Sequence, residues 1–451
     1  MRFYILLILN ILYFSDQVIG QNSPILEEYI QMGLTNNLTL KQHDLDIKKS
    51  IEAVRQAKML FYPTVDFEAN YTVAAGGRKI DFPIGDLLNP AYATLNQLTQ
   101  TNSFPTLENQ QIQFLPHNFH ETKFKFAYPL YNTDLKYNRQ IKELMTLNQA
   151  AQKAAYEQEL RYTIALAYLQ LLQAIEAEKV WINAKSVQIE LRRFNESLVK
   201  NNVATREILA DADYEISTTE QEIFDLQTKQ NTAKSYFNFL INRDLQSDIK
   251  IDSTLLLQPI PNYEREQSIQ TALSNRKEFE VLQTGKSISN TVVDMNKANK
   301  KLPDLYIGGE TGFQGFGYKF NKDQAYILAR VGLTYNIYDG GAQNSKTQQA
   351  RIDSDKINSQ IEQVQQQIAL QVTDRWNQLQ SAKNAVISRE KGQKAAEDAY
   401  KIINNKYRAG QVLHLEWSNA QNRVTIAQLQ TVLAKLNVIQ AHQGLLQATN
   451  N

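Results

Sequence analysis

Two long stretches without helix-breaking residues constrain this chain more than any other feature of its sequence. No proline or glycine occurs between Pro129 and Pro259, and no proline follows Pro303. A single glycine lies between Gly341 and Gly410. Because proline and glycine interrupt helices, these stretches predict helices much longer than those of a compact domain.

Apolar residues recur in these stretches at alternating spacings of four and three. The two clearest series are Leu160, Ile164, Ala167, Leu171, Ala174 and Ile357, Ile361, Val364, Ile368. This heptad-like spacing predicts helices that pack lengthwise on one another. The predicted long helices cover residues 134–200 and 342–409, and the predicted return helices cover residues 204–249 and 411–449. At about 1.5 Å per residue, each long helix reaches roughly 100 Å.

Four other segments alternate apolar and polar residues. They cover about residues 64–73, 122–131, 304–313 and 327–338. In the first segment, Val65, Phe67 and Tyr71 point one way, and Asp66 and Glu68 point the other way. Period two over about ten residues is typical of a transmembrane β-strand, whereas the strands of soluble sheets are nearer five or six residues long. The segments therefore favour membrane strands over an amphipathic soluble sheet.

The chain is predicted to be an internal duplication. Pro63 and Pro303 begin matching strands 240 residues apart, and Tyr128 and Tyr335 lie in matching strands 207 residues apart. Each half contains a strand, a loop, a second strand, a long helix, a turn and a return helix. The predicted repeats cover residues 21–260 and 261–451.

The change between these two offsets locates an insertion between the first two strands, at residues 74–121. Four of the ten prolines fall within it, and much of the rest is Asn, Gln and Thr. The counterpart in the second repeat, residues 314–326, is short. The insertion is therefore predicted to be a long surface loop, a kind of segment that is usually functional or disordered.

The first twenty residues predict export from the cytoplasm. Arg2 precedes an apolar run that is too short to span a bilayer, and Gly20 provides a small residue at the end. This order indicates a signal peptide at residues 1–20, with Gln21 as the first mature residue, rather than a buried N-terminal helix. Beyond the signal, no apolar run is long enough to predict a membrane-spanning helix.

The composition excludes several classes of function. The chain has no cysteine, which excludes a cysteine-linked lipid anchor, disulfides and thiolate metal sites. Its net charge is +1, from 48 basic and 47 acidic residues, so it has no electrostatic footprint for nucleic acid.

The four predicted strands also limit the assembly. Strands in lipid cannot leave an edge unpaired, and the smallest membrane barrels have eight strands. Several chains must then share one barrel. Two chains would fill the barrel with their own side chains, whereas three give twelve strands and room for a lumen. A cyclic homotrimer embedded in outer-membrane lipid is therefore predicted.

Four motifs carry a resemblance to a known family. They are Gly33-Leu34-Thr35-Asn36-Asn37-Leu38, Tyr335-Asn336-Ile337-Tyr338-Asp339-Gly340-Gly341, Tyr407-Arg408-Ala409-Gly410 and Leu415-Glu416-Trp417-Ser418-Asn419-Ala420-Gln421-Asn422. With their order, spacing and duplication, the whole mature chain resembles the TolC-type outer-membrane efflux proteins. The resemblance implies a mixed α/β membrane protein, with four transmembrane β-strands per chain in a twelve-stranded barrel shared by a trimer. Long coiled-coil-like helices would form a periplasmic α-barrel with a closing tip.

The resemblance also implies partners and their docking sites. The expected partners are a periplasmic membrane-fusion (adaptor) protein and an inner-membrane pump of the RND, ABC or MFS type. Two chain reversals would face the adaptor: Val199, Lys200, Asn201, Asn202, Val203, Ala204 and Tyr407, Arg408, Ala409, Gly410, Gln411, Val412. Gly410 suits the left-handed end of a helix, and asparagine tolerates that conformation next best at Asn202. The alternative for both is a plain helical hairpin turn.

Two further positions follow from the same resemblance. The family often places acidic residues beyond the second tip, where they narrow the entrance, and Glu416 and Asn419 fall there. They are expected to form the pore constriction, with a solvated helix face as the alternative. Asp339 with the two glycines after it, and Asn132 in the first repeat, are expected to cap the long helices.

No catalytic residue, metal site or cofactor is predicted. The five histidines are scattered, and the spacing of His117 and His120 is weak evidence for a metal. The predicted function is the outer-membrane channel of a tripartite efflux or type I secretion system, in a Gram-negative outer membrane and extending into the periplasm. The alternatives are a periplasmic coiled-coil adaptor or scaffold protein, which would not explain the strands, and a secreted enzyme.

Overall fold

The computed structural model describes residues 23–450, which fall into two compact units. The helical unit contains the described part of Met1–Ile51, with Leu144–Ser289 and Ile352–Asn451. The sheet unit contains Glu52–Glu143 and Asn290–Arg351. The predicted signal peptide, residues 1–20, lies outside the described residues.

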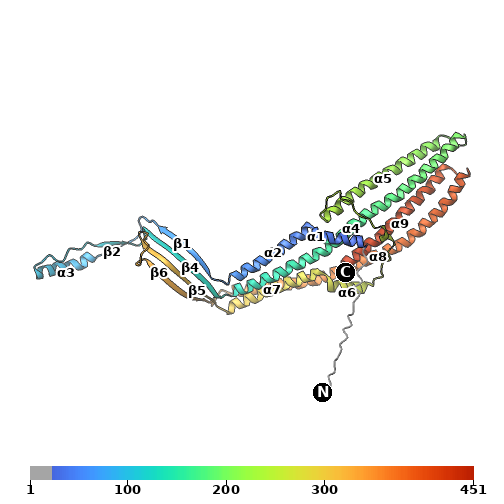
Figure 1. Ribbon diagram of the computed structural model, residues 1–451. Coiled ribbons are helices and arrows are strands. Elements are labelled where there is room, and N and C mark those ends of the chain that lie inside the picture. The colour runs from blue at the N-terminus through green and yellow to red at the C-terminus, as the bar shows by residue number, and fades with distance from the viewer. Residues whose placement is uncertain (1–22, 451) are drawn as a thin grey trace, which may run out of the picture. The chain divides into compact units, whose positions relative to one another are not determined.

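An antiparallel four-stranded sheet forms the body of the sheet unit (Figure 1). Its strands are β1 (Thr64–Thr72), β4 (Phe119–Tyr131), β5 (Asp304–Phe316) and β6 (Ala325–Thr334), in the order β1-β4-β5-β6. Each of the four predicted strand segments overlaps one of them. Because every neighbouring pair is antiparallel, the two edge strands β1 and β6 run in opposite directions.

The alternation seen in the sequence divides this sheet into two chemically different faces. Val65 lies opposite Phe126, and Phe67 lies opposite Phe124. These side chains share one face, and Val65 and Phe67 are 67% and 61% exposed. Successive side chains of a strand point to opposite faces. The acidic and basic residues between them, such as Lys125, therefore lie together on the other face.

The strand registers agree with both offsets of the duplication. Thr64 pairs with Ala127 in the first repeat, and Asp304 pairs with Thr334 in the second. Thr64 and Asp304 are 240 residues apart, and Ala127 and Thr334 are 207 residues apart. The two hairpins therefore have the same residue-level register.

The insertion at residues 74–121, predicted to be a long surface loop, contains secondary structure of its own. It contains β2 (Lys79–Phe82), α3 (Ile84–Thr99) and β3 (Gln110–Gln113), and β4 already begins at Phe119. Strands β2 and β3 form a separate two-stranded sheet. One of its four prolines, Pro90, lies inside α3.

Strand β6 ends earlier than predicted, for a reason that lies in its partner. The predicted strand 327–338 stops at Thr334. Thr334 pairs with Asp304, the first residue of β5, so Tyr335 and the residues after it have no β5 residue to pair with.

The two return helices are also shorter than predicted. The helix predicted at 204–249 is α5 (Glu207–Leu240), and the helix predicted at 411–449 is α9 (His414–Thr449). The chain leaves α5 because Asn242 takes a left-handed conformation, with φ 54°. The Asn238 side chain then donates to the carbonyls of Leu245 and Ser247, which stabilises the loop that follows.

Two helical hairpins dominate the helical unit (Figure 1). The first pairs α4 (Thr133–Lys200) with α5, and the second pairs α8 (Ala342–Arg408) with α9. The helical unit also contains α1 (Pro24–Asn36), the 3-10 helix η1 (Ser253–Leu257) and α6 (Arg265–Asn275). Helices α2 (Leu38–Met59) and α7 (Lys277–Lys301) begin in this unit and end in the sheet unit. None of the helices within residues 23–450 combines the length and the apolar composition that a membrane span needs.

The hydrophobic core of this unit follows the predicted heptad positions. Leu160 and Ile164 of α4 pack with Leu26 and Ile30 of α1 and with Phe237 of α5. All five residues of the first heptad series, from Leu160 to Ala174, are buried. A second cluster joins α6, α8 and α9 around Val372, Leu379 and Leu445.

Candidate functional site

The polar face of the sheet carries a network of charged side chains. The Lys123 amine lies 2.6 Å from the Glu121 carboxylate and 3.1 Å from that of Glu310. The Lys125 amine lies 2.6 Å from Glu68 on the neighbouring strand. These pairs suit a water-facing surface, since charged groups need hydrogen-bonding partners or solvent.

The edges of the sheet decide what the sheet can do. Within the described residues, β1 and β6 each have a neighbour on one side only. Unpaired strand edges are templates for pairing with another chain, and in lipid they cannot remain unpaired. A sheet with one apolar face, one charged face and two open edges can therefore close into a barrel with further copies of itself.

The two chain reversals of the helical unit have the same backbone geometry. Asn202 and Gly410 have positive φ angles of 56° and 74°. The amide of Val203 donates to the Leu198 carbonyl at 2.9 Å, and the amide of Gln411 donates to the Lys406 carbonyl at 2.9 Å. Both reversals are Schellman-type helix ends, and the predicted roles of Asn202 and Gly410 in the turns are confirmed.

Most of the predicted tip residues are available to a partner. Those exposed to solvent are Lys200, Asn201, Asn202, Val203, Arg408, Ala409, Gly410 and Gln411. Val203 is apolar and 71% exposed. Val199, Ala204 and Val412 are half-buried, and Tyr407 is buried.

Tyr407 ties the ends of two helices together instead of facing outward. Its hydroxyl donates to the Asn195 side-chain oxygen at 2.8 Å, joining α8 to α4. Burial raises the pKa of the Tyr407 phenol, so the hydroxyl keeps its proton and remains a donor. Asn195 is fully buried, which makes this bond costly to lose.

A small apolar cluster surrounds this bond. Trp417 is 1% exposed and packs with Leu191 and Tyr407. Its indole nitrogen donates to the side-chain oxygen of Asn404 at 2.9 Å. Sequence reasoning missed the role of Trp417, although a tryptophan among polar neighbours was a usable signal.

Polar contacts also join α5 to the helices beside it near the tips. The Ser418 hydroxyl donates to the Glu215 carboxylate, linking α9 to α5. Arg192 of α4 contacts Asp213 of α5 at 2.5 Å, and this hydrogen bond lowers the pKa of that carboxyl. The first contact joins the two hairpins to each other, and the second joins the two helices of the first hairpin, both close to the chain reversals.

The two predicted constriction residues lie on one exposed side of α9. Glu416 and Asn419 are exposed, and the residues between them, Trp417 and Ser418, are buried. A spacing of three places both side chains on neighbouring positions of the helix surface. Among the described residues, no side-chain hydrogen bond holds Glu416 or Asn419 against the protein. Both side chains can therefore face water or a lumen.

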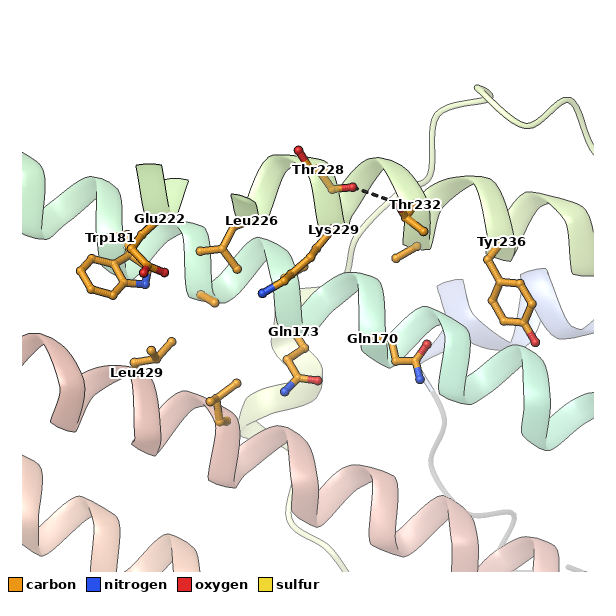
Figure 2. Close-up of a pocket in the computed structure, with 14 residues that line it drawn as sticks. Gln170, Gln173, Trp181, Glu222, Leu226, Thr228, Lys229, Thr232, Tyr236 and Leu429 are labelled. Atoms are coloured by element: carbon orange, nitrogen blue, oxygen red, sulfur yellow. Dashed lines mark hydrogen bonds between the residues drawn. The ribbon is translucent and has the colours of Figure 1, made fainter. Parts of the chain in front are cut away.

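A groove of about 690 Å³ lies among α4, α5 and α9. Figure 2 shows Trp181 near one end of the groove and Tyr236 near the other. Glu222 and Lys229 supply one acid and one base, and the remaining lining is mostly aliphatic or amide. The lining therefore combines apolar surface with amides, hydroxyls and one pair of opposite charges.

His120, one of the two histidines predicted in the insertion, has a structural role. His120 is fully buried, and its Nε2 lies 3.0 Å from the Lys319 carbonyl and 2.9 Å from the Gln324 side-chain oxygen. The ring therefore fixes the β5–β6 loop onto β4. Over residues 23–450, no group of three acidic or histidine side chains has metal-binding geometry.

Comparison with known proteins shows that the chain is similar to outer-membrane efflux proteins in part of its sequence and in its fold. Residues 268–451 match the family model described as outer membrane efflux protein. A segment of 119 residues is 29% identical to the outer membrane efflux protein BepC of Brucella suis, and covers 26% of this chain and 26% of BepC. The sequence match therefore spans about a quarter of that relative.

Solved structures match over nearly the whole chain. The channel protein CusC aligns with a TM-score of 0.74 at 13% identity, covering 96% of this chain and 95% of CusC. VceC of Vibrio cholerae aligns with a TM-score of 0.71 at 16% identity, covering 94% and 96%. At these identities the likeness shows the fold. The resemblance to the TolC-type outer-membrane efflux proteins is therefore confirmed, since residues 268–451 match the model of that family and the chain has the fold of its solved channels.

Proposed function

We propose that this chain is one of three identical subunits of an outer-membrane channel, in a tripartite efflux or type I secretion system. The observation that carries the proposal is the four-stranded sheet, with its apolar face and its two open edges running in opposite directions. A neighbour's β1 can pair with β6 and continue the antiparallel sheet. Three copies then give twelve strands, with the apolar face toward lipid and the charged face toward a water-filled lumen.

The long helices support the remainder of the proposed path. Helices α4 and α8 contain 68 and 67 residues, so each is about 100 Å long at 1.5 Å per residue. Three such pairs of hairpins would line a tunnel through the periplasm. The proposed transport needs no chemical step, and we propose no catalytic role for the chain.

The tips are the proposed docking sites for partners. The reversals at residues 199–204 and 407–412 expose mostly basic and amide side chains, together with the apolar Val203. A periplasmic adaptor protein would bind there and connect the channel to an inner-membrane pump. The pump would be of the RND, ABC or MFS type.

Glu416 and Asn419 are the proposed constriction of the entrance. Three Glu416 carboxylates around one axis would attract cations into the opening. Glu416→Gln should reduce the cation preference of single channels in planar bilayers, and Asn419→Asp should increase it. Unchanged ion selectivity in both variants would place these residues on a solvated outer face instead.

The channel itself is tested by assembly and conductance together. The protein should fractionate with the outer membrane, and chemical crosslinking there should stop at three chains. The purified trimer should form pores in planar bilayers. A stable monomer in the soluble periplasm would contradict the proposal.

A further inference from the structure

The insert between β1 and β4, residues 73–118, holds its helix by an unusual set of contacts. The Asn89 side chain donates to the Leu107 carbonyl at 2.9 Å and accepts from the Leu107 amide at 2.8 Å. Asn96 makes the same pair of bonds with Phe104, at 2.8 and 3.0 Å. These two asparagines are seven residues apart, so one face of α3 is fixed to the returning chain.

Another face of α3 carries an exposed stripe of leucine, alanine and threonine that nothing else in residues 23–450 covers. Its residues are Leu87, Ala91, Thr94 and Leu98, with Leu95 beside them. Leu87 and Leu98 are 69% and 75% exposed, and Leu95 is 39% exposed. The spacing of four, three and four is that of a helix seam that packs against other helices.

The strands beside α3 show the same need for a partner. Strands β2 and β3 form a sheet of only two strands. An isolated two-stranded ribbon is marginally stable in water. Ile80 pairs with Ile112, and their side chains are 39% and 54% exposed. The insert as a whole therefore exposes apolar surface that nothing in residues 23–450 covers.

Charge distinguishes between the occupants that could cover this surface. The charged residues of the insert are Arg78, Lys79, Asp81, Asp86 and Glu108, of which only Asp86 lies in α3. Helices that lie on a membrane surface are rich in lysine and arginine, and α3 has neither. A nearly uncharged seam suits packing against an identical seam, where no like charges meet.

The position of the insert favours a second copy of this chain. The insert begins directly after β1, an edge strand of the sheet. In the proposed trimer β1 is paired with the neighbouring subunit, so every insert starts at a subunit boundary. Rotation about one threefold axis repeats the stripe three times at the same height.

We infer that the α3 helices of three subunits pack together through Leu87, Ala91, Thr94 and Leu98, and form a helical clasp outside the membrane barrel. This inference rests on the proposed trimer. The partner of the stripe is the same stripe on the two other subunits. The clasp adds contacts between subunits beyond those of the shared sheet, and it would lie across the outer opening of the channel.

Single cysteines test the clasp cleanly, because the natural chain contains none. Leu98→Cys and, separately, Leu87→Cys place one thiol per subunit on the stripe. A short bis-maleimide should join two subunits of each purified trimer into a covalent dimer. The matched control is Gln97→Cys, an exposed position next to the stripe, which should not crosslink.

The outcomes separate the clasp from the trimer. Native mass spectrometry of the same samples gives the number of subunits. A trimer without crosslinks at Leu98 and Leu87, or with equal crosslinking at Gln97, overturns the clasp alone. A monomer overturns both the clasp and the proposed channel. If Leu98→Cys in membranes reacts with a water-soluble maleimide only after detergent is added, and does not crosslink, lipid covers the stripe and the inference is wrong.

Discussion

His442 should make the protein less stable as the pH falls from about 7 to 5. It lies in α9 and is 6% exposed, with Nε2 2.8 Å from the Tyr263 hydroxyl. Burial, and to a smaller extent the charge of Lys383, lowers the pKa of His442 from 6.5 to about 4. Protonating this ring in the folded protein would put a positive charge in an apolar site, near the positive charge of Lys383.

The sign and size of the effect follow from the difference between the folded and unfolded pKa values. The folded pKa is the lower one, so the unfolded chain binds the proton more readily between these values. Stability therefore rises with pH through this window and is lost as the pH falls. For one such histidine the loss is about 2 kcal/mol between pH 7 and pH 5, and approaches about 3 kcal/mol below the folded pKa.

Urea unfolding followed by circular dichroism at several pH values measures this loss. The glutamine in His442→Gln keeps a hydrogen-bonding partner for Tyr263 but does not titrate. Between pH 7 and pH 5 the variant should therefore retain the roughly 2 kcal/mol of unfolding free energy that the wild type loses through His442. Tyr263→Phe is the matched control, because it removes the hydroxyl and leaves the buried histidine. Its stability should be lower throughout, with the wild-type dependence on pH. If wild type and His442→Gln lose the same stability between pH 7 and pH 5, burial of His442 does not set the acid sensitivity.

Two further predictions concern the tips. Tyr407→Phe leaves the buried Asn195 without its donor and should cost about 1–3 kcal/mol, seen as faster hydrogen exchange at the ends of α4 and α8. Tyr214→Phe, at a tyrosine that is 75% exposed, should leave that exchange unchanged. Gly410→Val should lower the thermal midpoint, since a β-branched residue resists positive φ at a cost of about 1–3 kcal/mol. Asn202→Gly should not lower the midpoint, and equal effects of these two changes would contradict the matched geometry of the reversals.

Local patterns made much of this fold predictable. Strand segments were recognisable because one face of the sheet is apolar and the other charged, which imposes period two on the sequence. Gly410 and Asn202 marked the reversals because left-handed backbone restricts the residue type. Features of this kind depend on nearby residues, so a single sequence reveals them.

Features set by distant residues were missed or misplaced. Strand β6 stops at Thr334 because its partner strand starts there, which no local pattern records. Helix α3 continues past Pro90, and its Asn89 and Asn96 side chains bind main chain up to 18 residues away. The bond from Tyr407 to Asn195 joins positions 212 residues apart.

The duplication also predicts how neighbouring subunits pair. Strand β4, the second strand of the first repeat, pairs with β5, the first strand of the second repeat. The equivalent contact for β6 is with β1 of the next subunit. Within the chain, Phe126 lies opposite Gly309. The residue equivalent to Phe126 in the second repeat is Leu333, 207 positions later, and the residue equivalent to Gly309 in the first repeat is Ala69, 240 positions earlier. Leu333 should therefore lie opposite Ala69 of the neighbouring subunit.

Cysteine pairs can read this register directly in the cysteine-free chain. Directly opposite residues have Cβ atoms about 4.5–5.5 Å apart, close enough for an oxidised pair. A chain carrying both Ala69→Cys and Leu333→Cys should therefore close into a covalent ring of three when oxidised in membranes. Ala69→Cys with Ala329→Cys is the control, because a shift of four residues separates the thiols by about 13 Å along the strands. If the control pair closes the ring as well as the Leu333 pair, or if a trimer forms and the Leu333 pair stays reduced, the contact between subunits does not repeat the contact between the halves.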